Sequence, residues 1–194
     1  MLVLRMYLTL LVPIFAGIIN SIFCKSKILN GLKIPMDFGK NFVDGKRIFG
    51  DHKTIKGFIG YIIFNIIFSI LFGFLFQVFN GNSNNFFYMN HENTILYNIW
   101  IGFLIGLFYA LFELPNSFLK RRLDITPGKS TKGLSKIFFV FLDQADSVFG
   151  VALVVWMFYP IGWKVYLLYI LIGAGTHILI NMLLYFLHLR KNMF

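Results

Sequence analysis

Long apolar stretches alternate with shorter polar segments along this chain. Five of the apolar stretches, at roughly residues 2–23, 55–79, 95–114, 137–159 and 165–189, are long enough to cross a membrane. A helix rises about 1.5 Å per residue, so a hydrocarbon layer of ~30 Å needs about 20 residues. The pattern therefore predicts five transmembrane helices.

Helix-breaking residues separate these stretches. Asn80-Gly81-Asn82 follows the second stretch, Pro115 lies at the end of the third, and Pro160-Ile161-Gly162 forms a turn after the fourth. The first stretch is longer than the apolar region of a signal peptide, and basic residues follow it. We expect it to be a retained helix.

The composition agrees with a protein that has lipid as its main solvent. The 194 residues are 58% hydrophobic and 13% charged, and 25 of them are Phe, whereas a soluble domain is about 25% charged. We expect one all-α integral membrane domain over residues 1–194. The single cysteine, Cys24, excludes a disulfide within the chain and a cysteine-based metal cluster.

Basic residues mark the predicted sides of the membrane. The four connections and the C-terminal tail hold eight, none, six, one and two Lys or Arg, and the last count is Arg190 and Lys191. This alternation predicts a bundle with two large basic cytoplasmic loops, a cytoplasmic C-terminus and an outer N-terminus. The net charge of +10 is then explained by membrane topology and by contact with anionic lipid headgroups. No nucleic-acid partner is therefore expected.

Acidic residues gather on the same predicted side. Seven of the eight acids lie at or near the cytoplasmic face, and only Glu92 does not. Acids contribute little to membrane topology. Their distribution therefore indicates a functional site on the cytoplasmic side.

The first basic loop combines glycines, cations and acids from Pro35 to Gly57. Glycine lets backbone N–H groups approach a phosphate, and a helix N-terminus at Lys53-Thr54 favours anions. The candidate residues are Lys46, Arg47, Gly50, Asp51, Lys53, Thr54 and Gly57. The alternative is a basic segment that only contacts lipid headgroups, but the interleaved acids favour a site.

The third connection begins with a carboxylate at the edge of an apolar run. Glu113 is followed by Asn116, Ser117 and the basic cluster Lys120-Arg121-Arg122. A carboxylate at this depth is costly unless it is paired or bound to a metal. Glu113 therefore serves a site, forms a salt bridge with the basic cluster, or does both, and the basic cluster could itself be only a topology anchor.

The fourth helix carries two acids inside an apolar stretch. Asp143 and Asp146 are three residues apart, so both carboxylates share one helix face. Their mutual repulsion in a membrane would be relieved by a divalent cation, and oxygen ligands of this kind suit Mg²⁺. The alternative is that both acids pair with basic loop residues.

Several other polar or small residues within the apolar stretches have simpler interpretations. Asn65, His177 and Asn181 are expected to form hydrogen bonds between helices. Gly102 and Gly106 form a Gly-x-x-x-Gly face that predicts close helix packing.

Together, the three motifs resemble the CDP-archaeol synthase family, which is related to the CDP-diacylglycerol synthases. The resemblance rests on the run Pro35–Gly57, on Glu113 through Arg122, and on Asp143-Gln144-x-Asp146-Ser147, in this order and on one membrane face. Gln144 stands where the diacylglycerol enzymes have Arg. The His-Gly-Gly element of those enzymes has no counterpart here, which favours the archaeol branch.

The resemblance implies a membrane cytidylyltransferase that uses CTP, a lipid phosphate and Mg²⁺. Asp143, Asp146 and Glu113 would hold the metal, and Lys120 and Arg121 would act at the reacting phosphates together with both aspartates. Arg122, Asn116, Ser117 and the first-loop candidates would bind the nucleotide. Helices two, four and five would flank a groove for the lipid chains.

Other interpretations also fit the sequence. The substrate could be phosphatidic acid instead of an archaeal ether lipid. A small transporter or a lipid-binding scaffold is a different class, although five helices do not form two symmetric halves.

Overall fold

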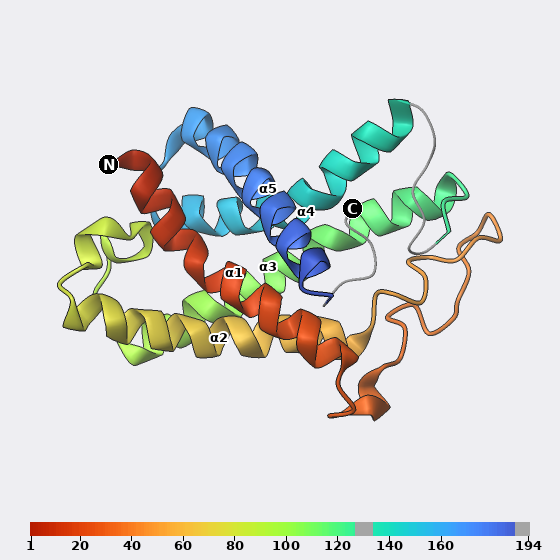
Figure 1. The fold of residues 1–194 in the computed structure, drawn as a ribbon, viewed down its shortest axis with the longest axis horizontal. Helices are drawn as coiled ribbons and strands as arrows, with labels where there is room; N and C mark the ends of the chain where they lie inside the picture. Colours follow the sequence, from red (N-terminus) through yellow and green to blue (C-terminus); the bar gives the residue numbers. More distant parts are fainter. Residues whose placement is uncertain (127–133, 189–194) are drawn as a thin grey trace.

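The described part of the chain forms a bundle of five long helices. The computed structural model describes residues 1–126 and 134–188, with side chains from residue 137 onward in the second range. The helices are α1 (Leu2–Lys25), α2 (Ile55–Val78), α3 (Ile95–Arg122), α4 (Leu134–Phe158) and α5 (Gly162–Phe186) (Figure 1). Short 3-10 turns in the connections cover Asn30–Leu32, Asn82–Asn84 and Phe86–Tyr88.

All five helices are long and apolar enough to cross a membrane. This confirms the prediction of an all-α, multi-pass membrane protein. Some of the cations used to predict topology, namely Lys129, Lys132, Arg190, Lys191 and the side chain of Lys136, lie outside the described residues.

The third helix is longer than the sequence suggested. α3 continues through Pro115 to Arg122 over 28 residues, so the expectation that it ends at Pro115 is wrong. A proline inside a helix removes one backbone hydrogen bond, which neighbouring helices in a membrane bundle compensate. Pro13 lies within α1 in the same way. The segment from Glu113 to Arg122 is therefore helical and rigidly placed.

Glycines bring α2 and α3 into close contact. A Cβ at Gly102 would lie 2.6 Å from the Cα of Ile66, and one at Gly106 would lie 2.6 Å from the Cα of Ile62. The predicted packing role of the Gly-x-x-x-Gly face is thus confirmed. Asn65 does not form the expected bond between helices within the described residues, because its amide donates to the Tyr61 carbonyl of its own helix at 2.8 Å.

The apolar core fills one half of the bundle. It joins the first half of α1, α3 and α5 to the second half of α4, and Phe86 and Phe87 of the α2–α3 connection close its end. Their rings pack near Tyr159 and Phe158, at centroid distances of 5.2 Å and 6.2 Å. The other half of the bundle, next to the first loop, is where the helices enclose a cavity.

The first loop is organised around one buried carboxylate. Asp37 accepts hydrogen bonds from the Arg47 guanidinium at 2.7 Å and from the backbone N–H groups of Phe49 and Gly50 at 3.0 and 2.8 Å. Burial alone would raise the pKa of Asp37, but these hydrogen bonds hold it well below its usual value. Asp37 therefore fixes the turn that leads to Lys53.

We expect Gly106→Val to destabilise the bundle by ~1–3 kcal/mol, because the new side chain meets the α2 backbone and forces the helices apart. Thermal unfolding of the purified protein in detergent measures the effect. Gly175→Val is the matched control, since a Cβ at Gly175 meets no atom within 4 Å. Equal stability of the two variants would contradict the packing role of Gly106.

We expect Asp37→Asn to loosen the first loop, because the amide cannot accept all of the hydrogen bonds that the carboxylate accepts. Trypsin should then cleave after Lys40 or Lys46 several times faster than in the wild type. Asp51→Asn is the control, since Asp51 is 68% exposed and contacts the same Arg47 at 2.9 Å. The prediction fails if both variants are cleaved at the same rate.

Candidate functional site

A pocket of about 530 Å³ occupies the half of the bundle beside the first loop. Its walls come from α1, α3, α4 and α5, and Phe49, His52 and Lys53 of the first loop stand at its mouth. Tyr61 is the one α2 residue among the residues that line it. The groove expected for the lipid chains between helices two, four and five stays a prediction; α4 and α5 supply walls of this pocket, and α2 takes part through Tyr61.

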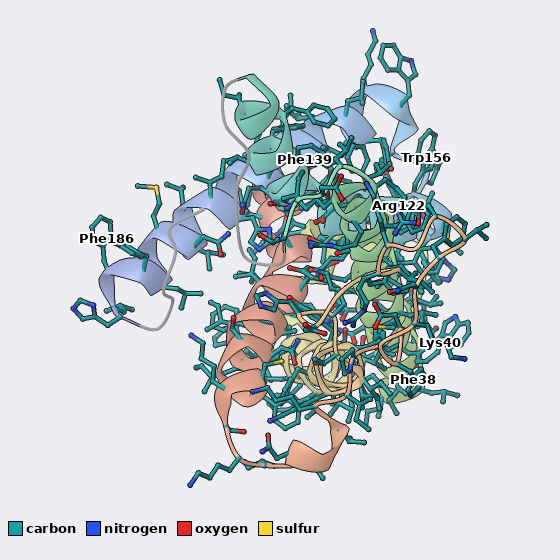
Figure 2. The ribbon with its side chains drawn as sticks, turned by 90° about the vertical axis from the view of Figure 1, so that its right-hand side faces the viewer. Phe38, Lys40, Arg122, Phe139, Trp156 and Phe186 are labelled. Carbon is teal, nitrogen blue, oxygen red and sulfur yellow. The ribbon has the colours of Figure 1, made fainter. Side chains whose placement is uncertain are left out.

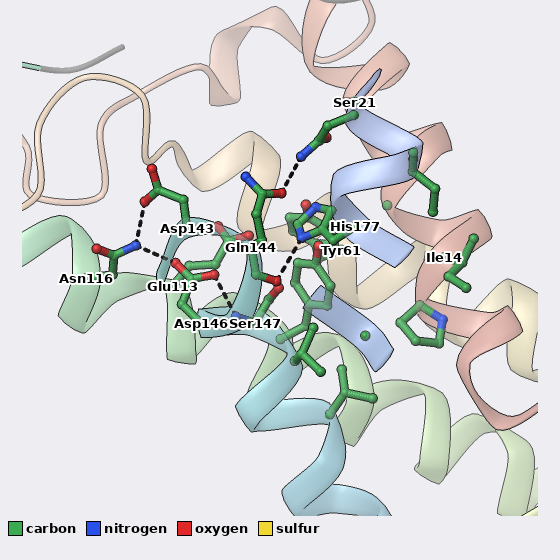
Figure 3. A pocket seen from close by; sticks show the side chains of 18 of the residues that line it. Ile14, Ser21, Tyr61, Glu113, Asn116, Asp143, Gln144, Asp146, Ser147 and His177 are labelled. Carbon is green, nitrogen blue, oxygen red and sulfur yellow. Dashed lines mark hydrogen bonds between the residues drawn. The ribbon is translucent and has the colours of Figure 1, made fainter. Parts of the chain in front are cut away.

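The two acids of α4 meet one amide of α3 inside this pocket. The side-chain nitrogen of Asn116 donates to Asp143 at 2.7 Å and to Asp146 at 2.8 Å (Figure 3). Asp146 is only 8% exposed, and its other oxygen accepts the Ser147 backbone N–H at 2.6 Å. The predicted sharing of one helix face by Asp143 and Asp146 is therefore confirmed.

Lysines neutralise the carboxylates. The Lys120 ammonium lies 2.5 Å from both oxygens of Asp143, one helical turn beyond Asn116 on α3. Lys53 of the first loop donates to Glu113. Glu113 thus pairs with the first loop, whereas one of the alternatives from the sequence was a salt bridge to the basic cluster of its own helix.

The Lys53 ammonium is held in its charged form. Burial alone would lower the pKa of Lys53, but the nearby carboxylates of Glu113 and Asp146 raise it above the usual value. Arg121 also lines the pocket, and no ion pair joins it to an acid within the described residues. The mouth therefore offers cations to an anionic ligand.

The oxygen atoms of this cluster suit a divalent cation. Asp143 and Asp146 converge on the side-chain nitrogen of Asn116, and the buried Asn116 side-chain oxygen has no hydrogen-bond partner within the described residues of the chain. Carboxylate and amide oxygens are the ligands that Mg²⁺ takes in proteins. Within the described residues, no group of three or more His, Cys, Asp or Glu side chains is arranged to hold a metal ion, so Mg²⁺ at Asp143 and Asp146 stays a prediction.

Other candidates from the sequence lie outside the pocket lining. The Thr54 hydroxyl caps α2 by accepting the Gly57 N–H at 3.2 Å. Gly50 adopts a positive φ of 93° and donates its N–H to Asp37. These residues shape the loop and the start of α2, and none of them faces the cavity.

Arg122, Lys46 and Arg47 are also engaged away from the pocket. Arg122 contacts Asp44 at 2.6 Å and lies between the rings of Phe42 and Phe118, at 5.2 and 4.6 Å from their centroids. Figure 2 shows Arg122 beside the first loop. Lys46 pairs with Asp124 at 2.7 Å, and Arg47 pairs with Asp37 and Asp51. These contacts tie the first loop to the end of α3.

Some pocket residues were not singled out as site residues from the sequence. They are Ser21, Lys25, His52, Tyr61, Tyr109, Gln144, Ser147, Thr176, His177 and Asn181. Polar residues inside apolar helices were the available signal for His177 and Asn181, and their expected role between helices is confirmed. His177 Nδ1 lies 3.2 Å from the Gln144 carbonyl, and Asn181 donates to the Gln144 side chain at 2.5 Å.

The pocket has two chemically different regions. Its mouth holds the ion pairs of Lys53 and Lys120, and its deep region is lined by apolar residues: Leu10, Pro13, Ile14, Val148 and Val151. The pocket thus offers both charged groups and apolar surface to a ligand.

Comparisons with known proteins agree with this geometry. The chain is 30% identical over 158 residues to a CDP-archaeol synthase of Methanocaldococcus jannaschii, covering 80% of this chain and 81% of the relative. A CDP-archaeol synthase of Archaeoglobus fulgidus is 30% identical over 174 residues, with 84% and 86% covered. A third, from Saccharolobus solfataricus, is 35% identical over 120 residues, which are 62% of this chain and only 57% of that relative.

A solved structure shares the fold. It is described as an intramembrane enzyme for archaeal membrane lipids biosynthesis, with a TM-score of 0.54 and 22% identity, over 87% of this chain and 92% of that one. The family model described as CarS-like, CDP-archaeol synthase, matches residues 2–194. The chain therefore belongs to the CDP-archaeol synthase family.

Proposed function

We propose that this protein is a membrane nucleotidyltransferase that joins CTP to a lipid phosphate and releases a CDP-lipid and pyrophosphate. The lipid is an archaeal ether lipid such as 2,3-di-O-geranylgeranylglyceryl phosphate. One observation carries the proposal: a single pocket joins a mouth of paired charges to an apolar interior between membrane helices. The names of the relatives support the same activity.

The cations at the mouth would hold the phosphate groups. Arg121 is free of ion pairs within the described residues, and Lys53 and Lys120 can exchange their carboxylates for the triphosphate of CTP. Preorganised positive charge of this kind stabilises the charge that develops on the leaving pyrophosphate. Ser117 lines the same wall and can donate a hydrogen bond to the nucleotide, whereas both N–H groups of Asn116 are used by Asp143 and Asp146.

The oxygen cluster would hold Mg²⁺. Asp143 and Asp146 are the ligands, Glu113 assists, and the Asn116 oxygen is within the same cluster. When bound, the cation neutralises phosphate oxygens and helps to orient the triphosphate. Asn116 would keep the two aspartates converged, and Lys120 would turn from Asp143 toward phosphate.

The reaction needs no strong general base. An anionic oxygen of the lipid phosphate attacks the α-phosphorus of CTP, a new P–O bond forms, and the bond to the β-phosphate oxygen breaks. Catalysis then consists of positioning the reactants in line and neutralising charge. The side chains at the pocket mouth supply both functions.

The orientation in the membrane follows from the same proposal. CTP is a soluble cytoplasmic nucleotide, so the mouth with Lys53, Lys120 and Arg121 faces the cytoplasm. The first loop lies there, and the N-terminus of α1 lies on the other side with the α2–α3 connection (Figure 1). The basic loops predict the same orientation.

The test of the proposed function is a transfer assay. Purified protein is incubated with radiolabelled CTP, Mg²⁺ and either the digeranylgeranylglyceryl phosphate or phosphatidic acid. We expect a CDP-lipid with the ether lipid, at a higher kcat/KM than with phosphatidic acid. Faster turnover of phosphatidic acid would show that the substrate is that of the CDP-diacylglycerol synthases. The absence of a product with either lipid would refute the proposed transferase activity.

We expect Asp143→Asn and Asp146→Asn each to lower kcat by about 100-fold or more, because each removes a charge that balances the cations and the metal at the reacting phosphates. Both variants should still insert into the membrane and unfold at a temperature near that of the wild type. Asp124→Asn is the control, since Asp124 is 76% exposed and outside the pocket. Rates at the wild-type level for both would refute the assignment of the site.

A further inference from the structure

We propose that Gln144 is the residue that binds the glycerol-phosphate end of the lipid substrate, and that the lipid reaches it from the membrane between α1 and α5. This inference rests on the proposed function and names the lipid side of the same pocket. It is carried by a buried amide with unused donors at the point where the charged and apolar regions of the pocket meet.

The side chain of Gln144 is buried but incompletely satisfied. It is 2% exposed and lines the pocket. Its oxygen accepts a hydrogen bond from Asn181 at 2.5 Å, which fixes the orientation of the amide. Its nitrogen has no hydrogen-bond partner within residues 1–126 and 137–188, and Figure 3 shows this nitrogen on the side of the amide away from the Asn181 bond. This nitrogen is not among the fully enclosed polar atoms that lack a partner, so it keeps surface in the pocket, where a ligand or water can complete its hydrogen bonds.

The position of Gln144 places these donors between two environments. Its neighbours in sequence, Asp143 and Asp146, belong to the charged mouth, while Val148 and Val151 line the apolar region at one and two turns further along α4. The amide adds hydrogen-bonding capacity without adding charge. It thus lies where the polar end of a lipid would meet the reacting phosphate.

The apolar region is bounded by two helices that barely touch. α1 packs mainly on α2, and α5 packs mainly on α4, whereas α1 and α5 meet at few points within the described residues. Both nevertheless line the pocket, α1 with Ile14, Gly17 and Ile18, and α5 with Gly173 and Ile180. Figure 1 shows the two helices on the same face of the bundle. A lipid chain that enters between them has few contacts to displace, one of which is the hydrogen bond from Thr176 of α5 to the Tyr7 hydroxyl of α1 at 3.5 Å.

The chemistry of Gln144 matches an ether lipid phosphate. The glycerol end of such a lipid offers ether and phosphate oxygens, which accept hydrogen bonds. The amide nitrogen of Gln144 can only donate. An amide that donates without carrying charge holds the lipid and leaves Lys120 and Arg121 to the triphosphate.

The experiment compares Gln144→Met, Gln144→Glu and wild type. Met keeps the length of the side chain and removes its hydrogen bonds, whereas Glu keeps the acceptor for Asn181 and removes the donors. We measure equilibrium binding of radiolabelled digeranylgeranylglyceryl phosphate in detergent without CTP, the KM for CTP, and thermal unfolding. Gln77→Met is the control, because Gln77 donates to the Asn93 carbonyl at the opposite end of the bundle.

We expect both Gln144 variants to bind the lipid phosphate about tenfold more weakly, as for the loss of one hydrogen bond to an anionic group. Gln144→Met should keep the KM for CTP within about twofold of the wild type, and Gln77→Met should leave lipid binding unchanged. If Gln144→Met unfolds, the uncharged Gln144→Leu takes its place, because the negative charge of Gln144→Glu would repel an anionic lipid whatever residue 144 contacts.

Three results would overturn the proposal. Unchanged lipid binding in both variants would mean that the amide does not contact the lipid. Weak binding in Gln144→Met with normal binding in Gln144→Glu would mean that Gln144 only joins α4 to α5. A rise in the KM for CTP alone would assign Gln144 to the nucleotide. If lipid binding falls as expected but the wild type makes no CDP-lipid, the proposed reaction fails and this binding site remains.

Discussion

An ionised carboxylate inside a membrane helix is stable only when a donor or an opposite charge reaches it, and this requirement organises the whole inner half of the protein. Asp143, Asp146 and Glu113 all lie on membrane-spanning helices. Lys120 and Asn116 reach the first two from α3, and Lys53 reaches Glu113 from the first loop. The helices and the loop must therefore meet at one point, and the pocket lies where they meet.

The fold separates tight packing from function along the membrane normal. The apolar core, closed by Phe86 and Phe87, fills the half of the bundle away from the first loop. The pocket takes up the other half, beside the first loop. Beside the pocket, the hydrogen bonds to Asp37 and the contacts of Arg122 hold the first loop in place. A site for a soluble nucleotide and a membrane lipid needs such an opening at the boundary.

The sequence predicted the elements better than the positions of individual side chains. Apolar length alone predicts five helices, and the spacing of Asp143 and Asp146 predicts a shared face. Pro115 led to a wrong prediction of the end of α3. A membrane bundle compensates for the backbone hydrogen bond that a proline removes, and no local sequence pattern shows this compensation. The role of Gln144 was not visible either, because it depends on Asn181, 37 residues further along the chain. Contacts between distant segments decide which polar residues face a cavity, and local spacing does not report them.

The basic triplet at the end of α3 shows how one motif divides into different roles. Consecutive residues on a helix point about 100° apart, so three adjacent cations cannot all face one ligand. Lys120 and Arg121 line the pocket, whereas Arg122 turns to Asp44 and the rings of Phe42 and Phe118. The third cation therefore does not add to the charge of the pocket lining. It anchors the first loop, which carries Lys53 to the mouth of the pocket.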